Sequence, residues 1–182
     1  MAFGRLFDRG ARRRRAAVES VYAALLAEAR DPCLYREGAV PDTFDGRFEM
    51  MIWHLAPITL RLRDGGAAAR AFSQDLFDHF LKDMDRSMRE AGVGDIAVPK
   101  RLKKMVRVWF GRVRAMEALE GVDDRAEAMR PVLERNLFPE SEAPDLAPLA
   151  HRLAERWRMV ATTPVEEIVA GHAPFARAEA AA

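Results

Sequence analysis

The chain has 182 residues, of which 49% are hydrophobic and 31% are charged, and its formal net charge is +1. This length suits one well-buried domain, and the small net charge excludes a general attraction to nucleic acid or to membranes. Any electrostatic function must therefore depend on a local cluster of charges.

Cysteine content and hydropathy limit the class of protein further. Cys33 is the single cysteine, so neither an intrachain disulfide nor a thiolate metal cluster can form. The most apolar run, residues 50–60, is shorter than the roughly 20 residues that span a bilayer. The first residues lack the apolar stretch of a secretory signal. We therefore expect a cytoplasmic protein.

Apolar residues recur at helical spacing along most of the chain, and no stretch keeps the two-residue period of a strand. Helices are expected over residues 14–30, from Asp42 or Thr43 to about 64, and over 67–90 and 98–120. Pro57 should kink or split the second of these, and Gly92 should cap the third. Two further helices fit residues 123–138 and 143–161. Thr163 and Glu166 have the spacing of a capping box that opens a short last helix.

This pattern predicts an all-α fold, a single compact multi-helix domain of about six helices. We expect a basic N-terminal tail over residues 1–13 and a helical domain over 14–162. Residues 163–182 are expected to form a short terminal helix and a frayed tail.

Motifs for catalysis, nucleotide binding or metal binding are missing from the sequence. The histidines are His54, His79, His151 and His172. No two of them have the spacing of a local zinc site. Asp83 and Asp85 form a D-x-D, but residues two apart on a helix point in different directions, so we interpret both as part of a solvated face. We expect no enzyme, no cofactor and no metal.

The clearest chemical feature is a basic cluster with no acid among its members, namely Lys100, Arg101, Lys103, Lys104, Arg107, Arg112 and Arg114. It begins the helix expected after residue 98, and the preceding helix ends in an acidic stretch, residues 83–90. Both arrangements oppose the helix macrodipoles. An antiparallel turn at 91–98 would let the acids pair with the cations across the two helices. A solvated face of this kind and a partner-binding surface both stay open.

Two stretches of the sequence resemble a known family. They are GAVPDTFDGRFEMMIWHL (residues 38–55) and FDHFLKDMDRSMREAGVGDIAVPKRLKKM (residues 77–105). Both closely resemble the ubiquinol-cytochrome c chaperone family, and the likeness covers about residues 17–155. The resemblance implies a helical assembly factor that binds newly made cytochrome b and promotes assembly of the ubiquinol-cytochrome c reductase complex without catalysis. Mitochondrial members work near the ribosome with a small partner protein.

The resemblance also marks candidate partner-binding residues in the two stretches. They are Asp45, Arg47, Asp83, Asp85, Arg86, Arg89, Asp95, Lys100, Arg101, Lys103 and Lys104. A further hypothesis concerns the methionines of these helices, which include Met50, Met51, Met84, Met88, Met105 and Met116. Adaptable thioether side chains beside a charged rim would suit a groove for an apolar client.

Two alternatives use basic residues differently. The basic helix 99–114 would bind the ribosome or another RNA through phosphate contacts, although Trp109 belongs to the apolar stripe and offers no stacking platform. We expect no DNA binding. Residues 1–15 would make a peripheral contact with an anionic membrane, on the cytoplasmic face of the inner membrane, and a disordered tail fits them equally well.

Overall fold

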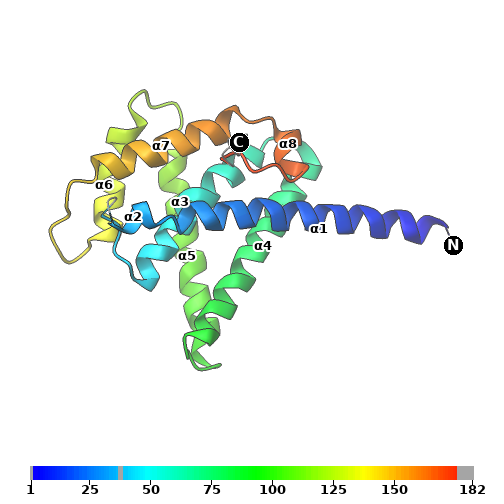
Figure 1. The fold of residues 1–182 in the computed structure, drawn as a ribbon, viewed down its shortest axis with the longest axis horizontal. Helices are drawn as coiled ribbons and strands as arrows, with labels where there is room; N and C mark the ends of the chain where they lie inside the picture. The colour runs from blue at the N-terminus through cyan, green and yellow to red at the C-terminus, as the bar shows by residue number, and fades with distance from the viewer. Residues whose placement is uncertain (1, 37–38, 176–182) are drawn as a thin grey trace, which may run out of the picture.

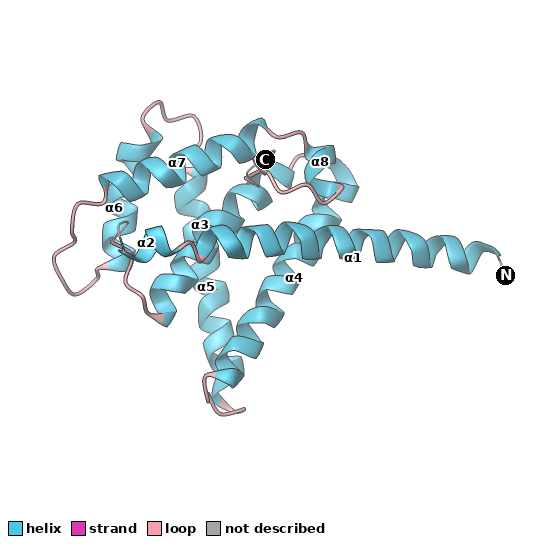
Figure 2. Cartoon of the chain, viewed as in Figure 1, coloured by secondary structure: helices cyan, strands magenta, loops and turns pink. Residues whose placement is uncertain are grey.

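The computed structural model describes residues 2–36 and 39–175 of the chain, with side chains from Gly10 onward. Within these ranges the fold is all-α, with eight helices and no strand, so the predicted fold class is confirmed (Figures 1 and 2). The helices are α1 (Ala2–Ala29), α2 (Pro32–Arg36), α3 (Phe44–Leu62), α4 (Gly66–Glu90), α5 (Ala97–Glu117), α6 (Arg125–Leu137), α7 (Ala147–Thr162) and α8 (Val165–Val169).

Helix α3 lies at the centre of the fold and contacts α1, α4, α5, α6 and α7. Every residue of its stretch 48–58 is buried. Burial on all sides is typical of a core helix, whereas apolar residues at helical spacing indicate a single inward face. Phe44, at the start of the helix, is 42% exposed. Its exposure matters for the site described below.

Pro57 does not split α3, which was one of the two outcomes that we predicted for it. The helix continues from Phe44 to Leu62 with Pro57 inside it. A proline in a helix interior removes one backbone hydrogen bond and costs about 3 kcal/mol. The apolar residues on both sides of Pro57 are buried against several neighbouring helices, and this burial offsets the cost.

The start of α3 is fixed by local contacts. Thr43 caps the helix, as predicted, because its Oγ1 accepts a hydrogen bond of 3.1 Å from the Gly46 backbone N–H. The chain before the cap passes so close that a Cβ on Gly46 would lie 2.0 Å from the Pro41 carbonyl oxygen. Only glycine fits at this position without a backbone shift.

Helices α4 and α5 contact each other and form an antiparallel hairpin whose turn lies at one extreme of the molecule (Figure 1). Gly92 ends α4 with a positive φ of 80°, which confirms its predicted capping role. The Gly92 N–H donates to the Arg89 carbonyl, and the Val93 N–H donates to the Met88 carbonyl. These two bonds define a Schellman motif, which turns the chain sharply into α5.

The two ends of the chain differ from the prediction. Helix α1 begins at Ala2 and not near residue 14, so most of the segment predicted as a tail is helical, and its first turns extend past the other helices (Figure 1). No proline interrupts this arginine-rich run, and arginine is a good helix former. The five-residue α2 was not predicted, because it is too short to show a period.

The predicted short last helix is confirmed as α8, but the prediction of a capping box at its start is wrong. The Thr163 hydroxyl donates to the Met159 carbonyl at 2.8 Å, and Pro164 occupies the N-cap position. Ile168 and Phe175 are fully buried, so the segment up to 175 is part of the packed core. The frayed tail predicted beyond it lies, from residue 176 onward, outside the described residues.

The close approach at Gly46 makes a testable prediction. Gly46→Ala should lower the free energy of unfolding by about 1–3 kcal/mol, because the new methyl group overpacks the Pro41 carbonyl. A matched control is Gly111→Ala within α5, where a Cβ would meet nothing within 4 Å. This change should stabilise the protein by about 1 kcal/mol through helix propensity. Urea unfolding measures both, and a neutral Gly46→Ala would contradict the tight turn.

Candidate functional site

Asp83 is buried, with 5% of its surface exposed. Our prediction that it belongs to a solvated face is therefore wrong. One carboxylate oxygen accepts a hydrogen bond of 2.8 Å from the Tyr22 hydroxyl on α1, and the other pairs with Arg86. Burial, with the Asp83 charge beside it, raises the pKa of the Tyr22 hydroxyl. Asp83 therefore connects α4 to α1.

The acids close to the hairpin turn are paired with arginines near them in sequence. The Arg89 Nε donates to Asp85 at 2.7 Å, and the same guanidinium pairs with Asp95 in the turn. The hydrogen bond from Arg89 lowers the pKa of Asp85. In the described parts of the chain, no ion pair joins the acids of α4 to Lys100, Arg101, Lys103 or Lys104. The predicted pairing of acids and cations across the two helices is therefore wrong.

One of the seven cations of α5 has a structural role. The Arg112 guanidinium forms a bidentate pair with the buried Glu49 carboxylate of α3, with Nε 2.9 Å from Oε2 and Nη2 2.7 Å from Oε1. Both side chains are largely removed from solvent. This pair joins α5 to the central helix.

The other six cations, by contrast, lack an acidic partner among the described residues. They are Lys100, Arg101, Lys103, Lys104, Arg107 and Arg114, and all six are exposed. The lining of a hollow between α3 and α5 separates two of them from the other four, although Lys104 lies only about 40° around the helix from Lys100. Arg101 and Lys104 face the start of α3, whereas Lys100, Lys103, Arg107 and Arg114 lie on the outer side.

A groove of about 530 Å³ lies between the start of α3 and the face of α5 that carries Arg101 and Lys104. We call it the α3–α5 groove. Its apolar lining consists of Phe44, Phe48, Met105 and Val108. Its charged lining consists of Asp45, Arg101, Lys104 and the Glu49–Arg112 pair. Apolar surface and unpaired cations thus meet in a single hollow, a combination suited to binding another chain.

The candidate residues marked by the resemblance separate into four groups. Asp45, Arg101 and Lys104 come together in the α3–α5 groove, while Lys100 and Lys103 lie outside it. Arg47 pairs with Asp42 at 2.6 Å and covers the Tyr35 ring, in a different hollow. The remaining members form the ion pairs of α4 and its turn that are described above, namely Asp83, Asp85, Arg86, Arg89 and Asp95.

The aromatic side of the groove was missed from sequence. Phe44 and Phe48 stand one helical turn apart in the first marked stretch, and this spacing was the available signal. Only the packing of α5 on α3 shows that they line an open hollow together with Val108.

The methionine hypothesis is wrong for the groove as a whole. Met50, Met51, Met84, Met88 and Met116 are buried in the core, away from the α3–α5 groove. Met105 alone of the six reaches its lining, and it too is largely buried. Core packing accounts for these side chains.

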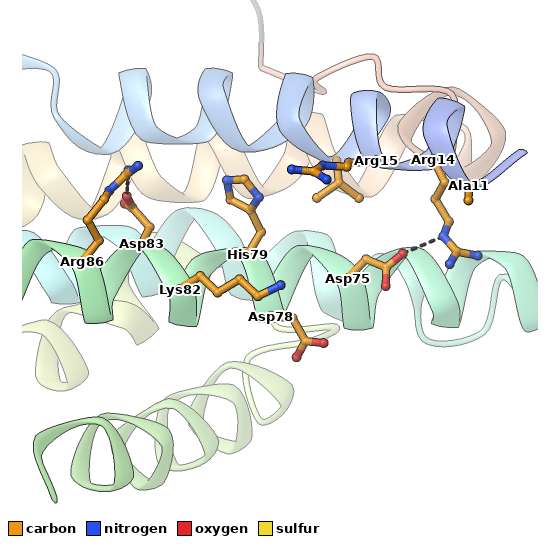
Figure 3. A pocket seen from close by; sticks show the side chains of 10 residues that line it. Ala11, Arg14, Arg15, Asp75, Asp78, His79, Lys82, Asp83 and Arg86 are labelled. Atoms are coloured by element: carbon orange, nitrogen blue, oxygen red, sulfur yellow. Dashed lines mark hydrogen bonds and ion pairs between the residues drawn. The ribbon is translucent and has the colours of Figure 1, made fainter. Parts of the chain in front are cut away.

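A second hollow, of about 570 Å³, lies between α1 and α4 and is shown in Figure 3. Arg14 of α1 reaches Asp75 of α4 at 2.6 Å, and Arg86 reaches Asp83 (Figure 3). Its charges thus largely neutralise one another, as expected for a contact that holds two helices together. Arg15 pairs with Glu19 on α1, so the arginine run that we considered for a membrane contact is partly engaged within the fold.

Two further searches concern metals and membranes. Among the described residues, no group of three or more His, Cys, Asp or Glu side chains is arranged to hold a metal ion. His54 is buried, its Nδ1 lies 2.7 Å from the Met50 carbonyl oxygen, and burial lowers the pKa of its imidazole to about 4. No helix in the described ranges combines the length and the hydropathy that a membrane span requires.

These features describe a helical domain with an amphipathic groove between α3 and α5, a surface suited to binding another polypeptide. The chain belongs to the ubiquinol-cytochrome c chaperone family, because the family model matches residues 36–176. It is also similar to the crystal structure of the Cbp3 homolog from Brucella abortus, with 35% sequence identity, a TM-score of 0.83 and 95% of each chain covered. No curated protein gives a significant match. The predicted family is confirmed.

The Glu49–Arg112 pair makes the second prediction. Glu49→Ala should lower the free energy of unfolding by about 3 kcal/mol, because it leaves the Arg112 charge uncompensated in a largely buried position. Replacing both residues with leucine should cost less than the sum of the costs of Glu49→Leu and Arg112→Leu measured singly. Glu19→Ala, which removes an exposed pair with Arg15, is the control and should cost under about 1 kcal/mol. Additive single and double changes in urea unfolding would show that the pair is not coupled.

Proposed function

We propose that this protein is a non-enzymatic chaperone that binds newly made cytochrome b and promotes assembly of the ubiquinol-cytochrome c reductase complex. Membership of the ubiquinol-cytochrome c chaperone family supports a chaperone role with a client protein. The α3–α5 groove is the observation that carries the proposal, since it combines exposed apolar surface with unpaired cations.

The groove fits the needs of a temporary binding site for a membrane protein. The partly exposed ring of Phe44 and the side chain of Val108 offer apolar surface, which gains about 25 cal/mol for each Å² removed from water. Arg101 and Lys104 stay hydrated at the rim and favour a segment that carries an acidic residue beside its apolar anchors. A small apolar contact and a charged rim give selectivity with a short residence time.

The groove also supports binding without catalysis. Its carboxylates are Glu49, which is held by Arg112, and Asp45, which is exposed. Contacts with a ribosome or with a small partner protein stay predictions.

The proposal is tested with the double variant Arg101→Glu/Lys104→Glu in the native host. Reversing the rim charges should lower the amount of cytochrome b captured with the tagged protein by at least about tenfold and reduce assembled complex III, because the rim then repels the acidic residue of the client. The measurements are quantitative mass spectrometry of the captured proteins and native gel analysis of complex III.

A matched control introduces the same charge change elsewhere. Lys82 and Arg158 are exposed, form no ion pair in the described chain and lie outside the α3–α5 groove, so Lys82→Glu/Arg158→Glu should leave both readouts unchanged. Normal capture and normal complex III in the Arg101→Glu/Lys104→Glu variant, with circular dichroism confirming its fold, would contradict the role of the groove. Normal complex III in the absence of the whole protein would contradict the proposed function itself.

A further inference from the structure

The outer side of α5 carries a second, separate arrangement of side chains. It consists of Ile96, Lys100, Lys103, Arg107, Phe110 and Arg114, whose spacing of 4, 3, 4, 3 and 4 places them in a single row along a helix. Ile96 precedes α5 but has helical backbone angles, so it continues the row. We call this row the outer face of α5. It is roughly 27 Å long at 1.5 Å per residue.

Two of its members are large hydrophobic side chains left in water. Ile96 is 85% exposed at the turn of the α4–α5 hairpin. Phe110, which follows Arg107 in the row, is 59% exposed. The described residues expose only two other large hydrophobic side chains, Phe44 in the α3–α5 groove and Val122. They lie about 21 Å apart along the helix axis, on a face that is otherwise charged, and each is free to contact a partner.

The four cations between and beyond them are free of ion pairs within the described chain. Two of them, Lys100 and Lys103, lie in the first two turns of α5, where a positive charge opposes the helix macrodipole. Asp83 and Asp85, near the end of α4, do not offset this cost, because Arg86 and Arg89 of the same helix hold them. A row of unpaired positive charges therefore lies between the two exposed apolar side chains.

We propose that the outer face of α5 rests on an anionic lipid bilayer, with Ile96 and Phe110 reaching into the boundary between headgroups and acyl chains. Cations near an anionic leaflet each increase partitioning about fivefold, and shallow apolar insertion supplies the second contribution that a stable peripheral contact needs. Ile96 directly precedes α5, in the hairpin turn that lies at an extreme of the molecule (Figure 1). This proposal is independent of the client and of the α3–α5 groove.

A bilayer suits this face better than RNA or an acidic protein does. The exposed apolar residue at the hairpin turn is an isoleucine, which cannot stack on a base, and Phe110 is the single aromatic of the row. The row also faces outward along a helix, and none of its residues lines the hollows on α5 or on α1 and α4 that a folded partner would fill. The α3–α5 groove lies roughly 120° further around the helix axis, so a membrane-bound molecule keeps it open to a client beside the membrane.

The test is sedimentation of the full chain with vesicles of phosphatidylcholine alone and with vesicles containing about 30% phosphatidylglycerol. Wild type should bind the anionic vesicles only, and raising NaCl to 0.5 M should release it, because added salt screens exposed charges. Lys100→Glu/Lys103→Glu should lower the partition coefficient at least tenfold. Ile96→Ser/Phe110→Ser should lower it severalfold and leave the dependence on salt in place.

Two controls separate this face from charge and hydrophobicity in general. Lys82→Glu/Arg158→Glu makes the same charge change elsewhere, and Val122→Ser removes a different exposed apolar side chain. Both should bind like wild type. Failure of wild type to bind, or equal losses in the controls, would overturn the proposal. Displacement from the vesicles by a 20-nucleotide RNA, with the Ile96→Ser/Phe110→Ser variant binding that RNA normally, would assign the face to nucleic acid and overturn it too.

Discussion

The buried carboxylate of Glu49 constrains how α5 can lie on the central helix. Burying an unpaired carboxylate costs several kcal/mol, so the Arg112 guanidinium has to reach it. Once Arg112 faces α3, helical geometry turns Arg101, Met105 and Val108 toward the start of α3 as well. The same geometry turns Lys100, Lys103 and Arg107 outward. One ion pair thus determines which cations line the groove and which face away from it.

The hairpin adds a second constraint, since it leaves the cations of α5 without acids to neutralise them. The Schellman motif at Gly92 folds α5 back along α4, but Arg86 and Arg89 already occupy Asp83 and Asp85. Lysines in the first turns of α5 therefore remain locally unfavourable. A fold that needed only stability would gain by pairing or removing these charges. Because these cations have no acidic partner in the described chain, they are available to another molecule, as a binding surface requires.

Local spacing in the sequence predicted much of the fold. The periods of apolar residues located α3, α4, α5, α6 and α7, and the capping roles of Thr43 and Gly92 followed from residue chemistry. What spacing could not show were contacts between distant segments. Asp83 is buried where it accepts a hydrogen bond from Tyr22, a residue 61 positions earlier in the chain. Helix α3 is surrounded by helices from both halves of the chain.

The same limit explains the partial success for the candidate site. Seven cations of α5 look alike in the sequence, yet Arg112 is set apart by a carboxylate 63 residues away. The family resemblance marked Asp45, Arg101 and Lys104 without indicating that they share a groove with Phe44 and Phe48. Only the packing of α5 on α3 separates residues that line this groove from those on the outer face.

The most direct test of this account uses a photoreactive phenylalanine analogue, benzoylphenylalanine, in place of Phe44 or of Phe110. The two positions lie on the two surfaces and already hold exposed aromatic rings, so the fold should tolerate both probes. After illumination of cells, the account predicts that the probe at position 44 links to cytochrome b and the probe at position 110 links to lipid. Cytochrome b linked at position 110 and absent at position 44 would contradict the assignment of the groove.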